Sequence, residues 1–294
     1  MVATNENVDL TIEDIMRFDA PPLQSTCSVV AGILAGFAVL FGVEVPTSRI
    51  LTANLVLYPL VPWAPFLAAL FLYFAWQYLN GRGWPPELSA ARQRMLRSRT
   101  VPPTVWLWSL ISGGLGLITW GALALLIAHL GRIGPVRSSD CCEVPPWTIA
   151  CVVLTKAIAE GIVQEAAFRG YIQTTLEKCC GPATAILLTA ALFGAVQLLR
   201  DPSLAVWLIS FGAGLILSLI AYLTGSIRPG IVLHVVAKLI FVTSWLQGVT
   251  HFSGESERSI LAISLAAIVL AVTTIAAFRR LDITVLDRAG EFHG

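Results

Sequence analysis

The 294-residue chain is 56% hydrophobic and only 13% charged, with a formal net charge of +1 and a mean hydropathy of +0.77. Soluble domains usually carry about 25% charged residues, so this composition indicates an integral membrane protein with little soluble mass. The near-zero net charge and the lack of a basic stripe argue against a nucleic-acid partner. No Gly-rich dinucleotide motif or P-loop is present, so no soluble cofactor is expected.

Apolar stretches long enough to cross a bilayer, about 20 residues each, recur along the chain. They predict an all-α integral membrane protein, a bundle of about eight transmembrane helices. The spans are expected at roughly 25–44, 55–80, 104–130, 148–172, 181–199, 203–223, 229–247 and 259–278. Residues 1–24 precede them as an acidic tail without the basic start of a cleavable signal peptide.

Two of these apolar stretches contain prolines or glycines that predict their local structure. The second is too long for one helix, and Pro59, Pro62 and Pro65 predict a kinked or re-entrant segment followed by a helix from about Trp63. In the third, the glycines are expected to let a neighbouring helix approach closely; they are Gly113, Gly114 and Gly116.

The loops also predict an orientation. With eight spans, both termini lie on one side, and the loops of that side hold more Lys and Arg than those of the other. The stretch from Arg92 to Arg99, "RQRMLRSR", is the strongest single anchor and suits anionic lipid headgroups. Both termini are therefore expected to be cytoplasmic.

Several charges fall inside the fourth span, where they are costly and indicate a functional site with partners to be found. At helical spacing Lys156, Glu160 and Gln164 form one stripe, and Glu165 and Arg169 form a second. Each charged pair has the i, i+4 spacing of neighbours on a helix surface. We expect this helix to lie centrally in the bundle. The pairs could serve a reaction, or they could only fix helix packing.

Three further polar residues lie in later spans: Gln197 in "ALFGAVQLL", and His234 and Lys238 one turn apart in "VLHVVAK". A salt bridge from Lys238 to Glu160 or Glu165 is the favoured interpretation of that lysine. Glu165 and His234 supply only two good metal ligands, whereas zinc sites usually take three or four from the protein, so no metal is expected.

In these residues the sequence resembles the CPBP intramembrane endopeptidases, which include the type II CAAX prenyl proteases and bacteriocin-processing proteins. The first family motif corresponds to "QEAAFRGY" (164–171), the second to residues 193–197, and the third to residues 234–238. Order and spacing agree over residues 148–250. The resemblance implies a membrane-embedded cavity in which a glutamate and a histidine activate water to attack a peptide carbonyl, with third-motif residues stabilising the oxyanion.

The resemblance also divides the chain. Residues 1–24 are the N-terminal tail, 25–147 the first transmembrane helices and loops, 148–250 the CPBP-like core, and 251–294 the last transmembrane helix with a cytoplasmic tail. The expected partners are membrane lipids and a membrane-embedded or lipidated peptide. We expect a multi-pass protein of a bacterial cell membrane.

The sequence departs from the family at all three motifs. Gln164 stands where the family has its first glutamate, Gln197 where it has the second-motif histidine, and Lys238 where it has an asparagine. Glutamine keeps size and hydrogen bonding but cannot take a proton, so the family's water activation is lost. General-base catalysis typically raises the reaction rate by about 10²–10⁴-fold, and this is the contribution that the replacements remove.

Three functions follow. The favoured one is a divergent, inactive endopeptidase that binds membrane-associated peptides. The first alternative is an active intramembrane endopeptidase that uses Glu165 or Glu160 with His234, while Arg169 and Lys238 remain candidate site residues. The second is a small transporter or channel that uses the buried charges as a relay, although neither an inverted repeat nor paired broken helices support it.

Overall fold

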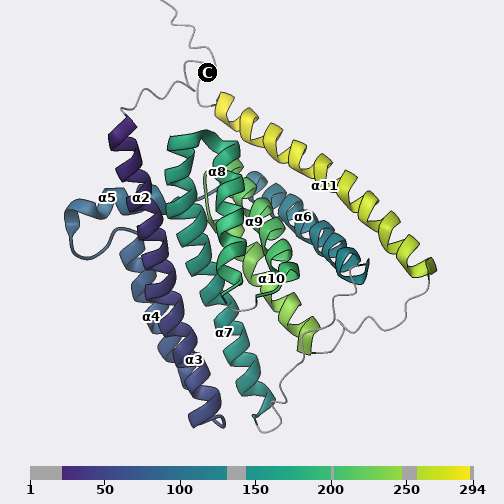
Figure 1. Ribbon diagram of the computed structural model, residues 1–294. Coiled ribbons are helices and arrows are strands. Elements are labelled where there is room, and N and C mark those ends of the chain that lie inside the picture. Colours follow the sequence, from purple (N-terminus) through teal and green to yellow (C-terminus); the bar gives the residue numbers. More distant parts are fainter. Residues whose placement is uncertain (1–21, 131–143, 200–201, 247–256, 292–294) are drawn as a thin grey trace, which may run out of the picture.

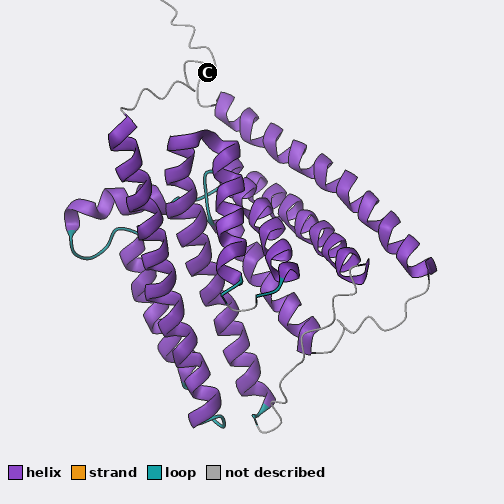
Figure 2. Cartoon of the chain, in the orientation of Figure 1, coloured by secondary structure: helices purple, strands orange, loops and turns teal. Residues whose placement is uncertain are grey.

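The computed structural model describes residues 22–130, 144–199, 202–246 and 257–291. Within these residues every regular element is a helix and none is a strand, as predicted (Figure 2). Among the described residues, five helical stretches are long and apolar enough to cross a membrane, which makes the chain a multi-pass integral membrane protein. Most of the acidic tail lies outside the described residues.

The first long helix differs from its prediction. It runs without a break through α2 (Pro22–Val39), the π-helical segment η1 (Leu40–Glu44) and α3 (Val45–Leu57). The expected end near residue 44 is therefore wrong, and the helix continues to Leu57. Pro46 lies just after the π-helical η1, whose wider turn lets the helix continue past a residue that has no N–H to donate. Glu44 consequently lies near the middle of a candidate span, Val29–Leu57.

The predicted break near Trp63 is confirmed. Helix α4 (Ala64–Leu79) begins directly after Trp63, with a proline in its first turn. A short segment, η2 (Pro86–Leu88), leads into α5 (Ser89–Leu96). Arg92 is buried and donates to three backbone carbonyl oxygens, those of Tyr78, Gly83 and Pro85. The Arg92 side chain therefore stabilises the segment that connects α4 to α6. Its predicted part in orienting the protein in the membrane is a separate matter.

The central part of the bundle is a helical hairpin. Helix α7 (Pro146–Gln164) continues through the π-helical η3 (Glu165–Ile172) into α8 (Gln173–Gln197). This stretch covers 52 residues, far more than one crossing needs, and Gly181 breaks it with a φ of 77°. In Figure 1 the chain turns back there, so most of α8 runs antiparallel to α7. The expected spans 148–172 and 181–199 are the two arms of this hairpin.

The other long helices begin close to their predicted starts. They are α6 (Pro103–Leu130), α9 (Leu204–Thr224), α10 (Arg228–Leu246) and α11 (Glu257–Glu291). Helix α11 packs along α6 at the outside of the bundle and continues beyond the expected end of its span (Figure 1). The finer count of eight crossings and the orientation remain predictions.

Close helix packing positions the site. Helix α2 lies against η3, and a Cβ at Gly32 would fall 2.1 Å from the Thr175 hydroxyl oxygen. A Cβ at Gly36 would fall 2.9 Å from the carbonyl oxygen of Ala167. In α6 the predicted close approach is confirmed for two glycines and wrong for the third: Gly113 and Gly116 meet neighbouring side chains, and Gly114 faces open space.

We expect Gly36→Ala to destabilise the protein by about 1–3 kcal/mol, because the added methyl group would push α2 away from the backbone of η3. Gly42→Ala is the matched control in the same helix, since a Cβ there meets nothing within 4 Å. Thermal unfolding of both purified variants in detergent checks this. Equal unfolding temperatures would contradict the tight α2–η3 contact.

Candidate functional site

A buried ion pair lies at the centre of the bundle. Glu165 opens η3, and Arg169 lies one turn further along the same segment. Arg169 Nη1 donates to Glu165 Oε1 at 3.1 Å, and both side chains are 0% exposed. The predicted pairing of these two residues is confirmed, as is the central position of their helix.

His234 of α10 joins this pair from a distant part of the sequence. Its Nδ1 lies 2.9 Å from the same Glu165 Oε1. An ionised carboxylate only accepts hydrogen bonds, so Nδ1 carries the proton and donates it. Helix α10 reaches Glu165 because Gly230 has no side chain: a Cβ there would fall 2.7 Å from Glu165 Oε2. The sequence "RPGIVLH" thus brings its histidine to the carboxylate.

The guanidinium of Arg169 is enclosed by the backbone and by aromatic rings. Its Nη2 donates to the carbonyl oxygen of Gly214 on α9, and the group lies 4.6 Å from the ring centre of Phe193. Phe193 also makes edge contacts with Phe168 and with His234. These contacts hold the charge in a position that excludes water, where a cation–π contact is strongest.

Gln164 has a charged partner that the sequence interpretation missed. Its Nε2 donates to both carboxylate oxygens of Glu44, at 3.2 and 3.0 Å. Glu44 is the last residue of η1 and is 4% exposed. A charge within an apolar stretch was the signal that could have found it. The sequence prediction placed Glu44 at the end of a span, which was expected to cover residues 25–44.

Lys238 is bound by a carboxylate, as predicted. Its Nζ lies 3.0 Å from Glu160 Oε2, which selects Glu160 from the two expected partners. Glu160 is mostly buried, whereas Lys238 is about a quarter exposed. Lys156, one turn before Glu160, is exposed. The pair therefore joins α7 to α10 one turn away from the Glu165–His234 contact.

Gln197 is buried near the end of α8, and its Nε2 has no hydrogen-bond partner among the described residues. It lies one turn after Phe193, and Gln164 lies one turn before Phe168. Because α7 and α8 run antiparallel and the two phenylalanine rings touch, both glutamines lie on the same side of that contact. The first-motif and second-motif positions thus lie at one level of the bundle.

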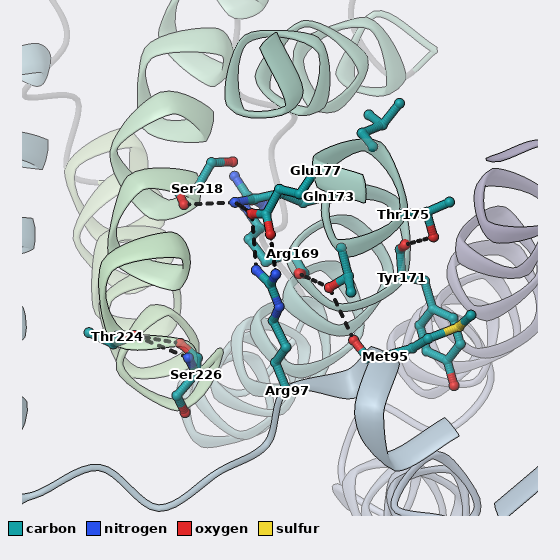
Figure 3. A network of polar contacts seen from close by, with 12 residues as sticks. Met95, Arg97, Arg169, Tyr171, Gln173, Thr175, Glu177, Ser218, Thr224 and Ser226 are labelled. Carbon is teal, nitrogen blue, oxygen red and sulfur yellow. Dashed lines mark hydrogen bonds and ion pairs between the residues drawn. The ribbon is translucent and has the colours of Figure 1, made fainter. Parts of the chain in front are cut away.

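A second polar network extends the site toward α5 and was not predicted. Gln173 Nε2 donates to Glu177 Oε1 and to the carbonyl oxygen of Ser218, and Arg97 forms an ion pair with Glu177. Figure 3 shows Arg97 reaching Glu177 beside Gln173 and Ser218, which links the segment after α5 to α8 and α9. The start of α8 is therefore joined both to α9 and to the segment that follows α5.

A cavity of about 350 Å³ lies between η1, the start of α3 and the end of α8. Glu44 lines it, as do Val196 and Leu199 on either side of Gln197 in the sequence. Glu165, Arg169 and His234 are not among the residues that line it. No group of three or more His, Cys, Asp or Glu side chains suited to a metal ion occurs within the described residues.

These features define a multi-pass helical membrane protein with a buried Glu–Arg–His cluster and a separate carboxylate–glutamine pair. Residues 146–240 match the family described as Rce1-like, type II CAAX prenyl endopeptidase Rce1-like. This part of the chain is therefore an Rce1-like domain of the CPBP family, as the motifs predicted. No curated protein and no solved structure matches the chain.

We expect Lys238→Met to lower the free energy of unfolding by about 1–3 kcal/mol, because it leaves the Glu160 carboxylate without its cation in a mostly buried position. Adding Glu160→Gln should cost little more, since the interaction is already lost. A double-mutant cycle in detergent measures this coupling. Strictly additive losses would show that the two side chains do not stabilise each other.

We expect Gln164→Glu, which restores the family residue, to destabilise this protein by about 1–3 kcal/mol. Two carboxylates would then face each other where Gln164 now donates to Glu44. The exchanged pair, Gln164→Glu with Glu44→Gln, should recover at least half of the loss. Thermal unfolding at pH 8 checks this. If Gln164→Glu alone unfolded like the wild type, the contact with Glu44 would be unimportant.

Proposed function

We propose that this chain is an inactive relative of the type II CAAX endopeptidases, a membrane protein that binds a membrane-associated peptide and does not hydrolyse it. The observation that supports this proposal most directly is the hydrogen-bonded pair of Gln164 and Glu44. The position that supplies the family's general base holds an amide whose nitrogen donates to a carboxylate from another helix. Gln197, at the second position, is likewise unable to accept a proton.

The remaining acid of the first motif supports the same function. Glu165 Oε1 already accepts hydrogen bonds from Arg169 and His234, and the side chain is fully buried. Both donors bind the same oxygen, so this carboxylate already holds Arg169 and His234 in place. Removing it would leave a buried guanidinium without its counter-ion, so a role in stability accounts for its retention.

A peptide remains the expected ligand class because the family acts on membrane peptides and proteins, and because a cavity lies beside the motif positions. Its volume of about 350 Å³ falls at the small end of ligand pockets, which run from about 300 to 1,000 Å³. That size suits a short segment of a membrane-associated chain, prenylated or transmembrane.

One observation favours an active enzyme as the second candidate. His234 donates through Nδ1 to Glu165, which leaves Nε2 as the nitrogen that could take a proton from water. A carboxylate that orients a histidine in this way is a recurring feature of general-base catalysis. In that case His234 would be the base and Glu165 its orienting partner.

The proposal is tested with purified protein in lipid nanodiscs and a panel of prenylated and transmembrane peptides, with products read by mass spectrometry. We expect the wild type to give no product. The variant Gln164→Glu/Gln197→His/Glu44→Gln, which restores both family residues and removes the opposing carboxylate, is expected to cleave. A wild-type product that disappears on His234→Ala, in protein that remains folded, would establish the second candidate instead.

A further inference from the structure

Two basic side chains border neighbouring cavities on the first long helix. Arg49 of α3 lines the cavity of about 350 Å³, together with Ser48. Lys156 of α7 lines a second, much smaller cavity, and Ser48 belongs to the wall of that one as well. Leu51, one turn after Ser48, packs in one cluster with Val152, one turn before Lys156. Arg49 and Lys156 therefore come from packed helices and border the same space around Ser48.

The two cations also lie at about the same depth in the bundle. Helix α3 ends and helix α7 begins at the same end of the molecule (Figure 1). Tyr58 and Trp147 lie there and are 70% and 58% exposed, as aromatic side chains at a membrane–water interface are. Arg49 and Lys156 are each nine residues from one of these aromatic residues, or about 13 Å along the helix. Both charges therefore lie nearly halfway into a hydrocarbon core of about 30 Å.

Neither cation has an anionic partner among the residues that the structure describes. Lys156 has the i, i+4 spacing for a pair with Glu160, but that carboxylate binds Lys238 instead. Glu44 lines both cavities, but it is 4% exposed and its carboxylate accepts from Gln164. Arg49 and Lys156 are exposed. Unpaired cations at this depth are costly, which indicates a site that takes an anionic group.

We propose that the larger cavity binds the C-terminal carboxylate of an apolar peptide, with Arg49 and Lys156 as its counter-ions. A guanidinium binds a carboxylate through two parallel hydrogen bonds, and an ammonium adds a compact charge. The hydroxyl of Ser48 can donate to the same group. The apolar part of the wall suits hydrophobic side chains at the end of the peptide; it is formed by Leu40, Phe41, Val45, Val196 and Leu199. The inference rests on the proposed function and names the end of the peptide that is recognised.

The test uses the full chain in nanodiscs of phosphatidylcholine and phosphatidylglycerol at pH 7. The probe is acetyl-Leu-photoleucine-Leu with a free C-terminal carboxylate, compared with the same peptide ending in a carboxamide. Crosslinked positions are located by mass spectrometry. We expect labelling of η1 or of the end of α8, at concentrations at least tenfold lower for the acid than for the amide, because hydrogen bonds between charged groups are stronger than those to a neutral group.

Two matched double variants separate recognition from folding. Arg49→Gln/Lys156→Met should reduce the preference for the acid to within about twofold. It should not lower the unfolding temperature, because it removes two exposed, unpaired charges from an apolar region. Arg82→Gln/Lys178→Met removes two exposed cations that line neither cavity, and it should leave the preference unchanged.

Three results would overturn the inference: equal labelling by acid and amide, a preference that survives Arg49→Gln/Lys156→Met, or no labelling of the cavity wall. Displacement of the acid probe by laurate as effectively as by the unlabelled peptide would also overturn it, since a fatty acid shares the carboxylate and the apolar chain but lacks the peptide groups. Cleavage of the bound peptide would overturn the proposed function and leave the inference standing.

Discussion

The burial of one ionised carboxylate is the constraint on which the centre of this protein depends. Glu165 and Arg169 are both inaccessible to solvent, so each charge depends on the other as its counter-ion. Arg169 binds α9 through Gly214, and His234 brings α10 to the same carboxylate oxygen. Helices α9 and α10 and the segment η3 therefore converge on one buried ion pair.

The two π-helical segments lie beside a second polar contact, between Glu44 and Gln164. In η3 the wider turn begins at Glu165, so the first motif lies within an irregular part of a helix that is otherwise α-helical. Opposite it, η1 ends at Glu44, which meets Gln164. The Rce1-like domain matched by residues 146–240 thus includes only one side of the contact. The other side comes from the first long helix, outside the matched region.

This arrangement explains the glutamine at the first-motif position. A glutamate there would oppose Glu44 across a hydrogen-bonding distance, and like charges at that separation repel strongly in a low-dielectric interior. Gln164 removes the repulsion and adds a donor for Glu44. The glutamine at position 164 and the carboxylate on the first helix are therefore linked by one contact.

The sequence alone determined the all-helical membrane class, the Glu165–Arg169 pairing and the family of the core, because apolar length, i, i+4 spacing and motif order are local properties of the chain. The sequence limited the expected ion-pair partner of Lys238 to two acids, and the packing of α7 on α10 selected Glu160. Only the tertiary structure identified Glu44, since its importance depends on a helix 120 residues away in sequence. It also decided how far the first helix runs, because a wide turn before Pro46 lets a helix continue where the sequence suggested an end.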